Sequence, residues 1–212
     1  MYYWNPKTGR YHNKSNNIFV SRTEILHHVD RENEKSKVRM QGLARRLTAN
    51  NITLPEFQTL AIEELKRSHI RMTLLGSGGK ASTSKAAYGA TGNRLKEEYN
   101  YLNNFVRAIS NGELTAERIV WRSGLYGNSS AAAFYKAEQI SRFENKGNKR
   151  LVAARSLDPN AQHCQDCVNL STYGKYLSVE QVVLPTRQCV CRSRCRCQMK
   201  YKLVKTPAPR RA

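Results

Sequence analysis

Residues 53–79 read TLPEFQTLAIEELKRSHIRMTLLGSGG, and this stretch decides the fold class. Thr53, followed three residues later by Glu56, forms a capping box that satisfies free backbone N–H groups at a helix start. Pro55 is tolerated in that first turn, where no N–H donor is needed. Apolar residues then recur on one helix face, at Phe57, Leu60, Ala61 and Leu65. The glycine-rich residues 76–79 end the pattern, so the sequence predicts one amphipathic helix.

Similar patterns cover residues 22–147. Thr23 is placed to cap a preceding helix with apolar positions at Met40, Leu43, Ala44 and Leu47. A later helix has a seam of alternating spacings, at Leu95, Tyr99, Leu102, Val106 and Ile109. Thr115 is placed to cap a further helix, which we expect Gly124 and Gly127-Asn128 to interrupt before residue 131. Short, glycine-rich connections between such helices predict an antiparallel bundle.

The two ends of the chain differ from this helical domain. Residues 1–21 alternate aromatic runs with Asn, Pro and Gly, which predicts a β-hairpin. Residues 148–205 carry all six cysteines between two short expected strands, at 151–154 and 199–204. Residues 206–212 are rich in Pro and Arg and predict an extended basic tail. The predicted fold is therefore mainly α: a helical bundle with an N-terminal β-hairpin and a small C-terminal zinc-stabilised α+β module.

The cysteines are the strongest chemical signal. Cys164 and Cys167 form a C-x2-C pair directly after His163, and a second set lies within residues 189–197. Two thiolates on one tight turn, joined by a second close set, can complete a tetrahedral Zn²⁺ site. Metal binding would also fold a segment that has little core of its own. Two other interpretations stay open, namely disulfides formed after cell lysis and buried thiols without a ligand.

The chain has an excess of positive charge, with 36 Lys and Arg against 16 Asp and Glu. Such an excess indicates a polyanionic or acidic partner. We expect phosphate contacts from basic residues of the module and the tail, namely Arg192, Arg194, Arg196, Lys200, Lys202, Arg210 and Arg211. Strand alternation would place the first three opposite the thiolates. The alternative is that these cations only offset the charge of a zinc–thiolate centre.

Other classes of protein are disfavoured. No stretch approaches the length of a membrane helix, and residues 1–10 do not resemble a signal peptide, so we expect a protein made in the cytoplasm with no membrane partner. Residues 76–82 lack the phosphate-loop spacing and follow a helix instead of a strand. No acid–base pair, nucleophile elbow or dinucleotide fingerprint is present, which predicts a protein that is not an enzyme.

Several stretches recur together in one known family. They are Tyr3-Trp4 with Gly9-Arg10-Tyr11 and Phe19-Val20-Ser21, the helix start at Ile52–Phe57, Ala86-Ala87-Tyr88-Gly89, Phe105 with Ile109 and Gly112, and Tyr126-Gly127-Asn128-Ser129. The most specific is H-C-x2-C…C-x3-C-x-C, at His163, Cys164, Cys167, Cys191, Cys195 and Cys197. In these pieces the chain resembles the tailed-bacteriophage minor head proteins of the Mu F-like head-morphogenesis family. It differs in having Cys189 as well, and no residues match the toxin-like catalytic domains sometimes fused to that family.

The resemblance implies a structural component of the virion head or head–neck region, made in the host bacterium and present in several copies or as a homo-oligomer. Its partners would be capsid or portal proteins and packaged DNA, bound without sequence preference. We expect Cys164, Cys167, Cys191 and Cys195 to hold the zinc, with Cys197 as the first substitute. The alternative function is a zinc-finger-like regulator that binds nucleic acid, which would need a base-reading helix near the cysteines.

Overall fold

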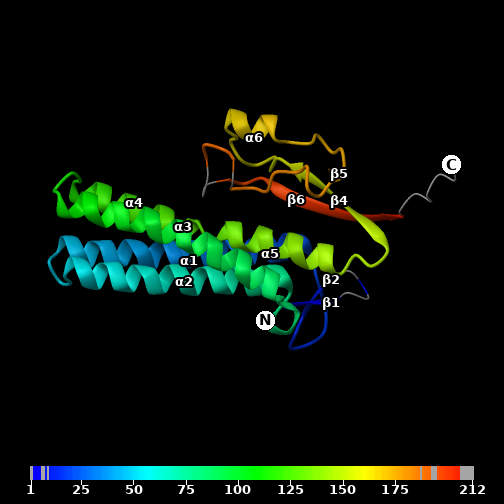
Figure 1. Cartoon of the computed structure of the whole chain (residues 1–212), viewed down its shortest axis with the longest axis horizontal. Coiled ribbons are helices and arrows are strands. Elements are labelled where there is room, and N and C mark those ends of the chain that lie inside the picture. Colours follow the sequence, from blue (N-terminus) through cyan, green and yellow to red (C-terminus); the bar gives the residue numbers. More distant parts are fainter. Residues whose placement is uncertain (1, 6–7, 9, 187, 192–194, 206–212) are drawn as a thin grey trace.

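The computed structural model describes residues 2–5, 8, 10–186, 188–191 and 195–205 of the 212-residue chain. Figure 1 shows long helices packed as a bundle, a small sheet near one end of it, and a second sheet along one side. The predicted class is confirmed at this level: the chain is mainly helical, with N-terminal and C-terminal strands. No helix among the described residues is long and apolar enough to span a membrane.

Helices α1 (Arg22–Thr48) and α2 (Leu54–Ser77) are joined by a short turn. The capping box of α2 is confirmed, because the Thr53 N–H donates to the Glu56 carboxylate at 2.7 Å and the Glu56 N–H donates to the Thr53 hydroxyl. The predicted cap of α1 is wrong: Ser21, not Thr23, accepts the hydrogen bond from the Glu24 N–H. A cap needs extended backbone before the first helical residue, and only Ser21, directly after strand β3, has it.

Helix α3 (Lys85–Ser110) follows a short 3₁₀ turn, η1 (Lys80–Ser82). Leu95 and Leu102 of the predicted seam are buried. Phe105 beside them is fully buried, edge-on to Phe57 of α2 and stacked on Tyr126 of α4. The seam is thus part of the core of this chain.

Helices α4 (Ala116–Asn128) and α5 (Ala131–Glu144) are separated at Ser129 and Ser130. The predicted break before residue 131 is confirmed, but its position at Gly124 and Gly127-Asn128 is wrong, because α4 runs through both glycines and ends at Asn128. A side chain at Gly127 would overlap the backbone of Lys37, so the glycine lets α1 and α4 approach each other closely. Its role is helix packing, which a single sequence does not distinguish from a helix break.

The N-terminal sheet consists of β1 (Tyr2–Asn5), β2 (Arg10–Asn13) and β3 (Phe19–Val20), antiparallel in that order. The predicted hairpin is confirmed and has a third short strand. Trp4 pairs with Tyr11 across it, and the Tyr11 hydroxyl donates to the Gly76 carbonyl of α2 at 3.1 Å. The sheet therefore closes one end of the bundle.

A buried ion pair reinforces this closure. Glu138 of α5 has no exposed surface and accepts two hydrogen bonds from Arg22 of α1. Arg142 lies one turn further on, near the Glu138 carboxylate and over the ring of Trp4. A buried carboxylate is stable only when its charge is matched, and here two arginines match it.

The C-terminal sheet has the order β5-β4-β6, with β4 (Lys149–Ser156) in the centre, β5 (Leu177–Ser178) and β6 (Gln198–Lys205). Both predicted strands are confirmed, and they pair antiparallel along their whole length. Leu151, Ala153 and Met199 share a core with Phe134 and Tyr135 of α5. Figure 1 shows the sheet lying along α5, with the short helix α6 (Gln165–Asn169) on its outer side. Residues 206–212, the predicted tail, lie outside the described residues.

Candidate metal centre

Three segments of the C-terminal module bring the cysteines together. Cys164 is the N-cap of α6 and Cys167 lies within that helix. Cys189 and Cys191 lie in a turned segment, while Cys195 and Cys197 lead into β6. Asp166 joins the first two segments, because its carboxylate accepts a hydrogen bond of 2.8 Å from the Val190 N–H.

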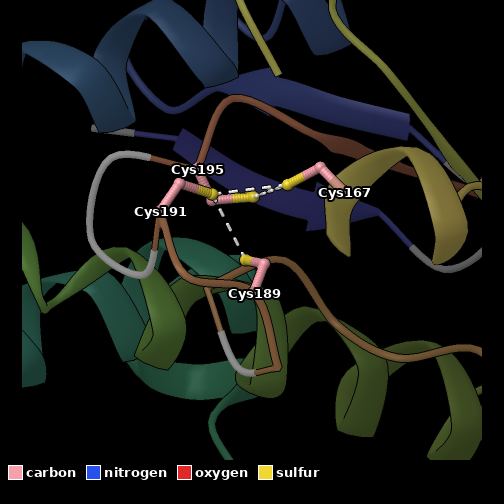
Figure 2. A group of neighbouring side chains, drawn as sticks. All are labelled: Cys167, Cys189, Cys191 and Cys195. Atoms are coloured by element: carbon pink, nitrogen blue, oxygen red, sulfur yellow. Dashed lines mark hydrogen bonds between the residues drawn. The ribbon is translucent and has the colours of Figure 1, made fainter. Parts of the chain in front are cut away.

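Four thiols form a compact group (Figure 2), namely Cys167, Cys189, Cys191 and Cys195. The Cys167 sulfur lies 3.3 Å from that of Cys191 and 3.7 Å from that of Cys195. The Cys191 sulfur lies 3.4 Å from that of Cys189. Four sulfurs around a tetrahedral zinc, each about 2.3 Å from it, are about 3.8 Å apart. The group therefore lies within metal-binding distance, and all six cysteines are free thiols.

A second group shares one of these thiols. His163, Cys167 and Cys197 also place their ligand atoms within 4.8 Å of one another. Cys197 has no exposed surface, and its carbonyl accepts a hydrogen bond from the buried Tyr135 hydroxyl of α5. Cys167 thus belongs to both groups.

The predicted ligands are only partly brought together. Cys167, Cys191 and Cys195 belong to the four-thiol group, but its fourth member is Cys189, which is not among the predicted ligands. Cys164, the remaining predicted ligand, belongs to neither group. Cys197, the predicted substitute, lies in the second group.

A buried arginine points into the thiols. Arg155 of β4 has no exposed surface, and its Nη2 lies 3.5 Å from the sulfurs of Cys167 and Cys197 and 3.6 Å from that of Cys195. Its Nη1 donates to the Val183 and Leu184 carbonyls. None of the ion pairs found among the described residues involves Arg155. The thiols are therefore the groups that can match this buried charge.

The thiols have unequal acidities. Burial is the main cause that raises the pKa of Cys167 and of Cys191, while neighbouring thiols act on both in opposite directions. Hydrogen bonds from backbone N–H groups, Cys167 first, lower the pKa of Cys164 to about 7. A hydrogen bond with Cys195, and then Arg155, lowers the pKa of Cys197. Buried thiols that resist ionisation alone become thiolates when a metal cation replaces the proton.

The residues predicted to contact phosphate differ in their structural surroundings. Lys200 and Lys202 are exposed on the edge strand β6. Arg196 forms an exposed ion pair of 2.9 Å with Asp30 of α1, outside any strand. The expected alternation around it is therefore wrong in the described part, since residues 195–197 form no strand. The remaining predicted contacts, Arg192, Arg194, Arg210 and Arg211, lie outside the described residues.

Sequence reasoning missed Arg155 and Asp166. Arg155 follows Leu151 and Ala153 on the core-facing side of β4, and a cation at such a position was the available signal. Asp166 lies inside the C-x2-C pair, but nothing in the sequence shows that its carboxylate binds the Val190 N–H.

Comparisons with protein-family models, with curated proteins and with solved structures find no match for this chain. The likeness to Mu F-like minor head proteins therefore depends on the quoted motifs alone.

Proposed function

We propose that this chain is a non-enzymatic structural protein of a tailed-phage particle, a minor head or head–neck component. In this proposal a zinc ion bound by cysteines holds the C-terminal module in shape against the helical bundle. The observation that carries the proposal is the four-thiol group, gathered from segments that have little core of their own.

Zinc is the metal that best fits the donors. Closely spaced thiolates are soft ligands, and a tetrahedral set of four favours zinc over the hard cations that prefer oxygen. The residues that would hold it are Cys167, Cys189, Cys191 and Cys195. Four protein ligands leave no open position for a substrate or a reactive water, which is typical of structural zinc sites.

The particle and its partners are inferred from two independent lines. The motif resemblance favours a virion component, present in several copies and bound to capsid or portal proteins. The formal net charge of +20 favours a polyanion nearby, and packaged DNA is the polyanion inside a phage head. Exposed lysines such as Lys200 and Lys202 would supply phosphate contacts without reading bases.

The regulator alternative is less well supported. A zinc-finger regulator needs a helix that enters the major groove, and two turns or more must be available to it. In the described part of the module the only helix is α6, which has five residues. Its position at the cysteines makes it part of the metal site.

Mass spectrometry of purified phage particles tests the proposed role. We expect the chain in mature virions, at a constant ratio to the portal protein. A chain found in infected cells but absent from particles would exclude the virion role and favour the regulator. Elemental analysis of the protein purified without added metal tests the zinc centre separately, and a zinc content near zero would exclude it.

A further inference from the structure

The centre has more donors than one tetrahedral metal uses. Six cysteines and His163 lie in or beside the two groups, and one zinc ion takes four of these seven side chains. The others would then be unligated thiols and an imidazole at the same place. Cysteines that only pack do not gather around one buried cation, so the surplus requires an explanation.

The two groups meet at one sulfur. The Cys167 sulfur lies near those of Cys191 and Cys195, and it also shares a group with His163 and Cys197. It is also one of the three sulfurs that face Nη2 of Arg155. A thiolate has lone pairs for two metals, so Cys167 has the position of a bridging ligand.

His163 makes a hydrogen bond of the kind that metal-binding histidines make. Its Nε2 lies 2.7 Å from the Asp158 carbonyl, and only a protonated nitrogen can donate to a carbonyl oxygen. The lone pair is then on Nδ1. Metal-bound histidines are usually held by this kind of hydrogen bond, from the second ring nitrogen to a backbone carbonyl.

Cys164 supplies the remaining donor. Cys164 belongs to neither group, but it is the N-cap of the helix that carries Cys167, and its thiol interacts with those of Cys167 and Cys191. With Cys167 shared, one metal has Cys167, Cys189, Cys191 and Cys195, and the other has Cys164, Cys167, Cys197 and His163. The seven side chains then fill both tetrahedral sets.

We propose that the module binds two zinc ions, bridged by Cys167, with His163, Cys164 and Cys197 completing the second site. This inference rests on the proposed zinc centre and adds the second ion to it. Two Zn²⁺ with six thiolates carry a net charge of about −2, the same as one Zn²⁺ with four thiolates. The buried guanidinium of Arg155 partly offsets this charge. One Zn²⁺ with six thiolates would instead carry about −4.

The test is the zinc content of the full chain after loading with Zn²⁺ and dialysis. We expect about two equivalents in the wild type and about one in His163→Ala and in Cys189→Ser, because each change removes a ligand of one site only. Cys167→Ser removes the shared ligand and should lose both ions. His27→Ala, at an exposed histidine of α1, is the matched control and should keep two.

A measurement on the wild-type chain tests the same proposal without depending on whether the variants fold. In protein loaded with ¹¹³Cd²⁺, two resonances coupled to each other through the Cys167 sulfur are expected. A single resonance, together with one equivalent of zinc in both the wild type and His163→Ala, would overturn the second site and leave the proposed single centre intact. A chain that binds no zinc would overturn both.

Discussion

Nη2 of Arg155 lies 3.5 Å from the sulfur of Cys167, and neither side chain has any exposed surface. Burial lowers the pKa of the guanidinium, but its hydrogen bond to Cys197 and the nearby thiols outweigh that effect, so the net pKa is raised. The cation comes from the central strand of the sheet that packs on α5. Charge balance at the centre is therefore linked to docking of the module on the bundle.

Replacing Arg155 by Met should weaken metal binding about 10- to 100-fold, which is the usual effect of losing a group that supports metal ligands. Methionine has a side chain of similar length but no charge, so the charge of the thiolates is no longer balanced. Zinc affinity, measured by competition with a chromophoric chelator, checks this. Arg150→Met changes an exposed arginine on the same strand and should leave the affinity unchanged. Equal affinities in the two variants would refute the role of Arg155.

Removing the metal should unfold the cysteine segments and spare the helices. The core around the thiols consists of cysteines with Leu157 and Leu170, which is too little to hold a fold without a metal. Helices α1 to α5 have their own buried clusters. Hydrogen exchange before and after chelation should therefore show lost protection in residues 164–170 and 188–191 and unchanged protection in α2 and α3. Unchanged protection in both regions would mean that the metal does not stabilise the module.

Two helix starts were predictable from local chemistry, whereas the start of α1 was misplaced by two residues. The Thr53–Glu56 box and the Thr115 cap depend on residues three positions apart, and both are present. The role of Gly127 in α4 was not predictable, because it depends on the backbone of Lys37, some ninety residues earlier in the chain. A helix break and a close helix contact both select glycine, and only the fold distinguishes them.

Replacing glycine by alanine should therefore have opposite effects on stability at two helical positions. Gly127→Ala places a methyl group against the Lys37 backbone and should destabilise the protein by about 1–3 kcal/mol, the usual cost of overpacking. Gly89→Ala, in an open position on α3, should stabilise it by about 0.5–1 kcal/mol because alanine favours the helix. Urea denaturation measures both changes. Similar small effects at the two sites would show that α4 does not pack closely on α1.

The sequence predicted that the cysteines cluster, but it did not predict which four of them form the compact group. C-x2-C spacing correctly indicated that Cys164 and Cys167 lie close together. The inclusion of Cys189 depends on the turn that the Asp166–Val190 hydrogen bond fixes, and that contact joins residues far apart in the sequence. Spacing restricts which thiols can meet, whereas long-range contacts select those that do.

The affinity for DNA should depend steeply on salt concentration and only weakly on the DNA sequence. With several phosphate contacts, affinity should fall about tenfold or more between low and physiological salt. Lys200→Gln with Lys202→Gln should reduce the slope of log K against log salt by about 2, one contact for each lysine. Lys66→Gln with Lys96→Gln removes the same charge from exposed positions on α2 and α3 and should change the slope less. Equal slopes for both double variants would show that β6 has no special part in binding.

Stability should also fall in acid because of a histidine inside the bundle. His69 of α2 has no exposed surface, and burial lowers its pKa from 6.5 to about 4. Its Nδ1 is 2.9 Å from the Leu65 carbonyl, and Nε2 is buried without a hydrogen-bond partner in the structure. The folded protein therefore holds His69 neutral, whereas the unfolded chain takes up a proton below pH 6.5. This contribution to stability is complete above pH 6.5 and is lost as the pH falls toward 4.

Between pH 7 and pH 4.5 the loss from His69 should be about 2–3 kcal/mol, at about 1.4 kcal/mol for each unit of pKa difference. Carboxylates also titrate in this range, so the prediction concerns the difference between variants. His69→Gln, which has no titratable group, should lower stability at pH 7 but lose less of it on acidification than the wild type. His27→Gln changes an exposed histidine of α1 and should follow the wild type. Urea denaturation at the two pH values measures the difference, and parallel losses in wild type and His69→Gln would show that this histidine is protonated without a stability cost.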